Sequence, residues 1–296
     1  MPDGAEVSVV VVVWNGMPWL ERCLESVRGR ETIVVDHGST DGSVELVRER
    51  FPEARLVERE NRGMGAGNNA GMALAGGRWL FLLNPDAWVT GEGLERLVRF
   101  GDAHPRAAVV GPRLRNPDGS LQRSVRAFPT TWRLATEYLG LRKLAPRSTA
   151  LNPLYAGGFA HDEVREVDWV SGAALLVRRE AADEVGLFDE GYFMFSEEAD
   201  WMFRFRAAGW EVWFDPDAEV VHVGGASHGG RLYLENLRGQ LRFLAKHRGV
   251  REAERARWML LWSLRLRGLV FRGERGRSYR EGARFLASAD VRALGS

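Results

Sequence analysis

Residues 7–14 read VSVVVVVW, and residues 15–18 read NGMP. The run of β-branched residues lacks an alternation of polar and apolar positions, which is typical of a parallel strand buried on both faces. Asn, Gly and Pro in the segment that follows are turn formers that end the strand. Apolar residues then recur at helical spacing over residues 19–27, so the chain is predicted to open with a strand, a turn and a helix.

The alternation of strand and helix continues along the chain. The sequence predicts strands at 32–36, 55–58, 79–83 and 107–111, and helices at 43–51, 68–75 and 94–104. This spacing is typical of βαβ units and predicts an α/β fold with a mostly parallel, Rossmann-like sheet and flanking helices. Residues 116–164 are irregular and rich in Pro, Gly and Arg, so we expect a long excursion there. The later predicted elements are a strand at 168–178, helices at 180–185 and 197–208, and strands at 212–214 and 220–223.

Acidic residues follow three of the predicted strands: Asp36, Glu58 and Asp86. Ligands of parallel α/β sheets bind beyond the carboxyl ends of the strands, so these positions indicate a binding site. Asp86 closes the sequence Asn84-Pro85-Asp86, in which a carboxylate on a stiff approach suits a divalent cation that also takes phosphate oxygens. Asn-Pro-Asp is equally ordinary turn chemistry, so the motif alone leaves both interpretations open.

A second acidic group comprises Glu197, Glu198 and Asp200, which open a predicted helix. Acidic residues at a helix start complement the helix dipole, so capping is one explanation. Three acids exceed what a cap requires, and aromatic residues surround them; a carboxylate in such surroundings has a raised pKa that suits a general base. His222 and His228, beside glycines near a strand end, are either structural residues or metal ligands.

The composition is that of an ordinary globular chain, with 45% hydrophobic and 27% charged residues among 296. The one cysteine, Cys23, excludes an intrachain disulfide and is interpreted as a small buried hydrophobic residue. Residues 1–6 are short, polar and acidic, unlike a signal peptide, and residues 9–13 are too few to span a bilayer. We therefore expect the protein in the cytoplasm.

The charge is unevenly distributed, although the formal net charge is only +1. Residues 231–296 hold sixteen Lys and Arg but six Asp and Glu, which leaves the rest of the chain acidic. Such a tail suits an anionic partner, for example a membrane surface. It lacks a recognisable nucleic-acid-binding motif and adjoins an acidic body, so no nucleic-acid partner is expected.

Two long helical patterns occupy this tail, at 232–247 and 252–271. In the second, apolar residues line one side and arginines are interspersed: Trp258, Leu261, Trp262, Leu269 and Val270, with Arg255, Arg265, Arg267 and Arg272. The arginines exclude an ordinary transmembrane helix. The pattern fits a basic amphipathic helix at a membrane interface, and equally a helical cap packed on the domain or on the partner subunit of a homodimer.

Two common signatures of nucleotide-binding sites do not occur in the sequence. No Gly-x-Gly-x-x-Gly follows the first strand, which disfavours a Rossmann dehydrogenase, and no Walker A loop is present. Gly63, Gly65 and Gly67 resemble a phosphate-binding loop, but Asn68 occupies the place of its last glycine. This loop does not define a phosphate site by itself.

Taken in order, the motifs resemble those of glycosyltransferase family 2, in particular its rhamnosyltransferase-like branch. The resemblance covers roughly residues 7–247 and rests on VVVVVWN (9–15), DHGSTDGS (36–43), ENRG (60–63), LNPD (83–86), DWVSGA (168–173), the segment 188–200, His222 and residues 224–228. It implies a GT-A fold over residues 1–230, followed by a basic amphipathic helical extension at 231–296. It also implies a nucleoside-diphosphate sugar as donor, with dTDP-rhamnose favoured and UDP-sugars open.

The resemblance also implies roles for individual residues at the donor site. Asp36 contacts the base or ribose of the nucleotide, and Asp86 matches the last acid of the family's Asp-x-Asp motif. Asn84 stands in place of the first acid, so His222 is the expected additional ligand of Mg²⁺ or Mn²⁺. The donor site as a whole is assigned to Asn15, Asp36, Glu58, Asn61, Gly63, Asn84 and Asp86.

Glu198 aligns with the family's catalytic base, but the family's usual pair is Glu-Asp and this chain has Glu197-Glu198. The choice between the two therefore stays open, and Asp200 completes the catalytic candidates. Trp169 and Gly172 are assigned to the pocket for a glycan or lipid-linked saccharide acceptor. A lipid-linked acceptor would place the enzyme peripherally at the inner face of the cell membrane.

The implied reaction is a single displacement with inversion. A metal at the diphosphate stabilises the leaving group, the base takes a proton from an acceptor hydroxyl, and the oxygen attacks the anomeric carbon. A sugar nucleotidyltransferase is one alternative, but it normally has a glycine-rich signature with a basic residue where this chain has Trp14-Asn15-Gly16-Met17. A non-catalytic nucleotide- or sugar-binding module is another, and it does not need the acidic group at 197–200.

Overall fold

The computed structural model describes residues 6–155, 157–224 and 230–295. His228 and its neighbours at 225–229, which belong to the last motif of the sequence, lie outside these ranges. The chain divides into two compact units, which are described separately below. Unit 1 comprises Met1–Val125, His161–Phe193 and Asp200–Ala226; unit 2 comprises Arg126–Ala160, Met194–Ala199 and Ser227–Ser296.

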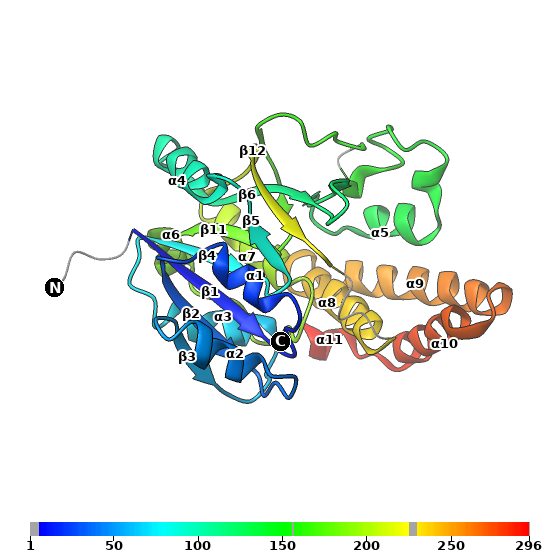
Figure 1. Cartoon of the computed structure of the whole chain (residues 1–296). Helices are drawn as coiled ribbons and strands as arrows, with labels where there is room; N and C mark the ends of the chain where they lie inside the picture. The colour runs from blue at the N-terminus through cyan, green and yellow to red at the C-terminus, as the bar shows by residue number, and fades with distance from the viewer. Residues whose placement is uncertain (1–5, 156, 225–229, 296) are drawn as a thin grey trace. The chain divides into compact units, whose positions relative to one another are not determined.

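A ten-stranded sheet forms the centre of unit 1, with the strand order β3-β2-β1-β4-β11-β6-β12-β5. Strands β1 to β4 lie side by side with parallel pairing, as Figure 1 shows. β11 pairs antiparallel with both of its neighbours, β4 and β6. The strands are β1 (Val7–Val13), β2 (Glu31–Asp36), β3 (Arg55–Glu58), β4 (Trp79–Leu83), β5 (Ala87–Val89), β6 (Ala107–Arg115), β11 (Ala174–Arg178) and β12 (Glu211–His222), with the short β7 (Leu121–Gln122) and β9 (Arg165–Glu166) beside them.

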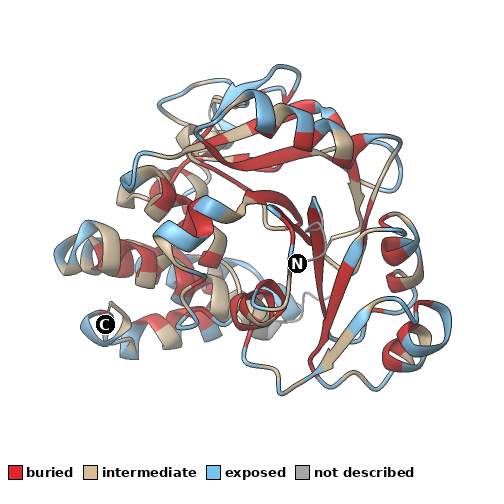
Figure 2. Ribbon diagram, turned by 90° about the vertical axis from the view of Figure 1, so that its left-hand side faces the viewer, coloured by how far each residue is buried: buried red, intermediate tan, exposed pale blue. Residues whose placement is uncertain are grey.

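The sheet is buried because helices cover both of its faces. Val9, Val11 and Val13 of β1 pack in one core cluster with residues of α1 (Leu20–Glu25), α2 (Ser43–Arg50) and α4 (Gly93–Ala103). The alternate residues of β1 face α3 (Met64–Met72) instead. Both faces of the strand are therefore apolar, as its sequence predicted, and Figure 2 shows the strands buried along most of their length.

The glycine-rich segment that resembled a phosphate loop is the first half of helix α3, so the predicted helix start at residue 68 was wrong. A Cβ on Gly67 would lie 2.6 Å from Val12 Cγ1, and a Cβ on Gly71 would lie 2.3 Å from Val10 Cγ1. The glycines thus let α3 approach β1 more closely than any larger residue allows. Close packing of α3 on β1 therefore explains the regular spacing of these glycines, which resembles that of a phosphate-binding motif.

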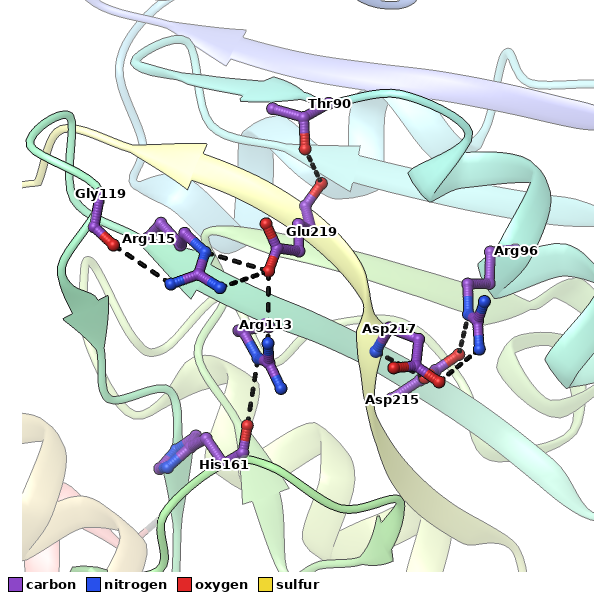
Figure 3. A network of polar contacts seen from close by, with 9 residues as sticks. All are labelled: Thr90, Arg96, Arg113, Arg115, Gly119, His161, Asp215, Asp217 and Glu219. Atoms are coloured by element: carbon purple, nitrogen blue, oxygen red, sulfur yellow. Dashed lines mark hydrogen bonds and ion pairs between the residues drawn. The ribbon is translucent and has the colours of Figure 1, made fainter.

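One long strand, β12, replaces the two short strands predicted at 212–214 and 220–223. Its pairing with β6 is irregular between Asp215 and Glu219, which interrupts the apolar pattern on which the prediction depended. Arg113 and Arg115 of β6 both contact Glu219 Oε1, at 3.3 and 2.6 Å, as Figure 3 shows. These ion pairs hold β12 in register up to its end at residue 222.

The segment predicted as irregular contains short regular elements. They are β7, β8 (Val125–Arg126), helix α5 (Thr131–Tyr138) and two 3₁₀ turns at Leu141–Lys143 and Pro153–Tyr155. The strand predicted at 168–178 is two strands, β10 (Trp169–Val170) and β11, separated by a turn at 171–173. Helices α6 (Arg179–Val185) and α7 (Glu197–Ala207) follow at nearly their predicted positions.

Unit 2 is helical, with α8 (Gly230–Arg248), α9 (Val250–Val270), α10 (Gly273–Ser288) and α11 (Val291–Leu294) packed together. The sequence predicted the first two and missed the last two. Several arginines of the tail have structural partners: Arg257 donates to Leu286 O at 2.8 Å, and Arg280 donates to Gly268 O at 2.9 Å. Within the described ranges, no helix is both long and apolar enough to cross a membrane.

Candidate functional site

The carboxyl ends of the parallel strands bring several predicted residues to one edge of the sheet in unit 1. Asp36 pairs in register with Val13 and with Glu58, so the ends of β1, β2 and β3 are level. Asn84 directly follows β4, which pairs with β1. The expectation that these strand-end residues share one edge is therefore met.

Asp36 is almost completely buried at this edge. Its Oδ1 accepts hydrogen bonds from the backbone N–H groups of Gly38 and Ser39, each at 2.9 Å. Its Oδ2 is buried and has no hydrogen-bond partner within the described residues. Because buried carboxylate oxygens are normally paired, this oxygen is suited to accept a hydrogen bond from a ligand.

The loops after β1 and β2 are joined by hydrogen bonds. The backbone N–H of Asn15 donates to Ser39 Oγ at 2.8 Å, and Asn15 Oδ1 accepts from the N–H of Thr40 at 2.9 Å. Asn15 has a positive φ of 54°, which Asn tolerates better than most residues. The Asn15 side chain therefore fixes the loop beside Asp36, a structural role within the predicted donor site.

His37 is a residue that the sequence analysis overlooked. It is buried, and burial, followed by the charge of Arg59, lowers its pKa, so the imidazole is neutral at pH 7. A Cβ on Gly67 would lie 2.8 Å from His37 Nε2, so the ring packs against the glycine face of α3. Nothing local in the sequence identifies this contact, because the two residues are thirty positions apart.

Asp86 and His222 are brought together by the pairing of β5 with β12, in which His222 lies opposite Ala87. His222 Nε2 is 3.3 Å from Asp86 Oδ1 and 3.4 Å from Asn84 Nδ2. Burial acts to raise the pKa of Asp86, but the contact with His222 and the N–H of Gly224 outweigh it and lower the pKa. Asp86 is therefore ionised at neutral pH.

Gln122 fixes the orientation of His222. Gln122 Oε1 lies 2.7 Å from His222 Nδ1, while Gln122 Nε2 donates to Asn116 Oδ1 at 2.9 Å and to His222 O at 3.2 Å. With its amide nitrogen donating elsewhere, Gln122 presents a carbonyl oxygen, so Nδ1 of His222 must carry the proton. Nε2 of His222 faces Asp86 and the amide of Asn84.

This geometry fits a divalent cation. An imidazole nitrogen beside an ionised carboxylate is a combination that binds metal ions. Among the described residues, no cluster of three or more His, Cys, Asp or Glu side chains occurs. A metal held by Asp86 and His222 would thus keep positions for water and phosphate oxygens, as Mg²⁺ usually does.

Cys23 contacts the same loop, because its Sγ donates a hydrogen bond to Asn84 O at 3.4 Å. Burial, with a smaller contribution from the charge of Asp86, raises the pKa of the thiol far above its usual value. The interpretation of Cys23 as a small buried hydrophobic residue is confirmed.

The remaining donor-site candidates have structural partners. Glu58 is exposed and forms an ion pair with Arg48. Asn61 Oδ1 accepts from the N–H of Gly63 at 3.0 Å. Gly63 has a φ of +100°, and a Cβ there would lie 2.3 Å from Phe193 O. Gly63 therefore allows the segment around Phe193 to approach α3, which is a scaffolding function for the site.

Asn69 of α3 holds the same segment and was not identified from the sequence. Its Oδ1 accepts from Phe188 N and its Nδ2 donates to Phe188 O, both at 3.0 Å. The amide also donates to Glu190 Oε1 at 3.1 Å. The buried Asn69 amide thus satisfies both backbone polar groups of Phe188, and it thereby positions the 188–193 segment beside α3.

The acceptor candidates lie in β10 and in the turn that follows it. Trp169 is buried in β10, and Gly172 is partly exposed in the turn. The N–H of Asn84 donates to Ala173 O at 3.0 Å. Gly172 is thus one residue from a direct contact with the Asp86 loop, whereas Trp169 lies below the surface.

Asp200, in unit 1, is fully buried in an ion pair with Arg204, whose Nε lies 2.9 Å from Asp200 Oδ2. Arg204 also donates to the carbonyl groups of Val185 and Leu187. The Asp200 carboxylate is therefore already used to attach α7 to the segment after α6. This environment favours a positioning function for Asp200 over proton transfer.

Glu197 and Glu198 belong to unit 2, where α7 begins. Glu197 is 7% exposed, and burial, followed by the negative charge of Glu198, raises its pKa well above the usual value. Glu198 is partly exposed. Glu197 therefore holds its proton to a higher pH than an ordinary glutamic acid, and Glu198 is the more exposed residue of the pair.

An unusual turn presents this pair. Phe195 and Ser196 are consecutive non-glycine residues with φ values of 69° and 72°, a conformation that costs free energy unless the surroundings enforce it. A Cβ on Gly239 of α8 would lie 2.5 Å from Phe195 O. Gly239 thus lets the helix backbone support the turn, and its position within a helical pattern gave no sign of this.

The sequence matches known proteins along most of its length. Residues 8–160 match the family model described as "Glycosyl transferase family 2". The chain is 34% identical over 295 aligned residues to the N-acetylglucosaminyl-diphospho-decaprenol L-rhamnosyltransferase of Mycobacterium tuberculosis, which covers 92% of this chain and 95% of the relative. It is 24% identical to the rhamnosyltransferase WbbL of Escherichia coli K12, over 82% of this chain and 94% of the relative.

A solved structure supports the fold. The mannosyltransferase PcManGT of Pyrobaculum calidifontis, in complex with GDP-Man and Mn²⁺, superimposes with a TM-score of 0.56 at 18% identity, covering 99% of this chain and 84% of that one. The GT-A fold with flanking and C-terminal helices, predicted from the sequence, is confirmed.

Proposed function

Since the chain belongs to glycosyl transferase family 2, we propose that it moves a rhamnosyl group from dTDP-rhamnose to a hydroxyl group of a lipid-linked saccharide, with inversion at the anomeric carbon. As a member of this family it is a glycosyltransferase that takes its sugar from a nucleotide donor. Both relatives reported above that match most of its length are named as rhamnosyltransferases. That shared name is the reason to favour rhamnose over another hexose.

The observation that carries the donor site is the convergence of Asp36, Asp86 and His222 at the carboxyl ends of the strands of unit 1. Asp36 Oδ2, buried and without a partner in the described chain, is placed to accept a hydrogen bond from the base or ribose. Asp86 and His222 would hold Mg²⁺ or Mn²⁺. When bound, the cation stabilises negative charge on the departing diphosphate.

Glu198 is the group that we assign as general base. The residue is partly exposed, whereas Glu197 beside it is buried and has a raised pKa. Glu198 takes the proton from the acceptor hydroxyl as the oxygen attacks the anomeric carbon. While it holds its proton, Glu197 adds no second charge next to the base.

The acceptor is assigned from the relatives and from the turn at 171–173. The mycobacterial relative is named for N-acetylglucosaminyl-diphospho-decaprenol, so a saccharide on a lipid diphosphate is the acceptor class that we propose here. Gly172 is partly exposed and lies one residue from the contact between Ala173 and Asn84, so we assign it to the acceptor. A lipid-linked acceptor implies that the enzyme works peripherally at the inner face of the cell membrane.

The proposal is tested by incubating the purified chain with dTDP-rhamnose or a UDP-hexose, Mn²⁺ and a synthetic N-acetylglucosaminyl-diphospho-lipid. Release of dTDP together with a rhamnosylated lipid of inverted anomeric configuration is the expected result. Efficient transfer from the UDP-hexose alone would replace rhamnose as the donor sugar. Release of nucleotide without any glycosylated lipid would exclude this acceptor class.

A further inference from the structure

Helix α9 in unit 2 exposes an unusual surface, which we call the α9 face. The large apolar residues among its exposed positions are between 50% and 83% exposed: Trp258, Trp262, Leu266, Leu269 and Val270. All other exposed positions of α9 are arginines: Arg251, Arg255 and Arg265. An isolated exposed apolar residue is ordinary, but a contiguous patch on a soluble domain marks an interaction site.

The helical geometry makes these residues one stripe. Trp258, Trp262 and Leu266 follow each other at intervals of four, which places them in a row along the helix. The opposite side of α9 is buried in unit 2 by Leu260, Leu261 and Leu264. Leu261, expected on the same side as the tryptophans, is therefore a core residue, and the helix has two separate apolar faces.

The acidic residues of α9 already have partners within unit 2. Glu252 Oε1 accepts from the N–H of Thr131 at 3.1 Å, and Glu254 pairs with Arg257 at 2.8 Å. The α9 face thus combines tryptophan, leucine and arginine, and the partly exposed carboxylate of Glu254, four residues before Trp258, is already paired with Arg257. Tryptophan and arginine are the side chains that suit the boundary between lipid headgroups and acyl chains.

We propose that the α9 face docks on an anionic lipid membrane, with Trp258, Trp262 and Leu266 in the headgroup region and the arginines against lipid phosphates. The helix would lie in the plane of the interface over about 31 Å. The inference rests on the proposed function for its biological reason, since a lipid-linked acceptor is found at a membrane. The structural basis of the inference is the composition and the exposure of the α9 face.

Charge distinguishes a membrane from a second copy of the chain. In a twofold dimer the same face meets itself, so the positive charges of Arg251, Arg255 and Arg265 would be brought close to the same charges of the second copy. An anionic bilayer offers phosphates to every arginine instead, and each basic residue near such a surface strengthens binding.

Co-sedimentation of the full-length protein with sucrose-loaded vesicles tests the proposal. The wild-type chain is expected to bind vesicles of phosphatidylglycerol and phosphatidylcholine, and to bind pure phosphatidylcholine much more weakly. Arg255→Gln with Arg265→Gln should weaken binding to the anionic vesicles by about 30-fold. Trp258→Ala with Trp262→Ala should weaken it by about tenfold or more.

Matched control variants remove the same groups elsewhere. Trp132→Ala removes a tryptophan that is exposed to a similar extent, and Arg55→Gln with Arg99→Gln removes two exposed charges from unit 1. Both controls should bind vesicles like the wild type. Equal losses in the controls would show that binding follows total charge or tryptophan content and would overturn the assignment to α9.

Light scattering and calorimetric binding of dTDP complete the experiment. A wild-type dimer that the tryptophan variant dissociates, without vesicle binding, would assign the face to a second copy and refute the proposal. Wild-type protein that binds dTDP but no vesicles would refute the docking surface and leave the proposed function standing. Vesicle binding without dTDP binding would support the α9 face and count against the proposed function alone.

Discussion

Asp86 and Glu197 are acidic residues shielded from solvent, yet their surroundings push their pKa values in opposite directions. Asp86 is held ionised by His222 and the N–H of Gly224. Burial and the charge of Glu198 raise the pKa of Glu197. Two acids with opposed environments in one enzyme generally have different chemical functions. This difference is consistent with the proposed function, in which Asp86 would hold the metal at the diphosphate and the pair at 197–198 would serve proton transfer.

The largest expected effect separates the two members of that pair. Glu198→Gln should lower kcat by up to about 10⁴-fold, because the variant no longer accepts the acceptor proton. Glu197→Gln should lower it far less, since glutamine resembles a protonated glutamic acid. Steady-state kinetics, with dTDP affinity as the control for folding, measures both. A loss of equal size in Glu197→Gln would contradict the assignment of the base.

The next effect tests how His222 is oriented. Gln122→Leu removes the carbonyl that fixes the Nδ1–H form of the ring, so Mn²⁺ affinity should fall by about 10- to 100-fold. Gln122→Glu keeps an acceptor at the same place and should retain the affinity. Titration followed by electron paramagnetic resonance measures the metal, and ¹⁵N spectra of labelled histidine report the tautomer. An unchanged tautomer in Gln122→Leu would remove Gln122 from this function.

A smaller effect concerns the turn that presents Glu198. Gly239→Ala should destabilise the protein by about 1–3 kcal/mol and reduce activity, because the added methyl group meets Phe195 O. Gly268→Ala, in α9, is the matched control, since its methyl group would approach mainly the flexible Arg280 side chain. Urea unfolding compares the two. Stabilisation by Gly239→Ala, as ordinary helix propensity favours, would show that the contact is unimportant.

The smallest effect is in the pH dependence of stability. Since the pKa of Glu197 is higher in the folded state, the folded state binds the extra proton, and stability falls as the pH rises from about 4.5 towards the folded pKa. The slope is at most about 1.4 kcal/mol per pH unit. Glu197→Gln abolishes this contribution, so its advantage over the wild type should grow between pH 5 and 7 in urea unfolding. A constant difference would mean that Glu197 is ionised in the folded protein.

Asp86 affects the pH dependence of stability in the opposite direction to Glu197. Its pKa is lower in the folded state, so its stabilising contribution is present above its unfolded pKa and is lost as the pH falls through the folded value. Asp86→Asn should therefore flatten only the acidic end of the stability profile. The same unfolding series, extended below pH 4, measures this.

The strand-end residues could be predicted from the sequence because the rule that governs them is topological. A buried β-branched run followed by Asp36 or Asp86 requires only that parallel strands end at the same edge. The function of the glycines in α3 could not be predicted, because what decides it is the contact of Gly67 with Val12 and His37. Local sequence shows a glycine spacing, but not the strand that lies against it.

Gln122 illustrates the same limit at the site. It lies in a segment that reads as irregular, one hundred residues before His222. The pairing of β7 with β6 and of β12 with β6 brings the two together. A polar residue in a loop gives no indication of its partner until the register of those strands is known.

Calorimetric titration of dTDP into the wild-type chain and into Asp86→Asn, each with and without Mn²⁺, tests whether this edge of the sheet is a metal-dependent donor site. Mn²⁺ should tighten dTDP binding to the wild type by about tenfold or more, and the Asp86→Asn variant should bind dTDP equally with and without the metal. Folded wild-type protein that binds dTDP with no effect of Mn²⁺, or an Asp86→Asn variant with the full metal effect, would contradict the assignment.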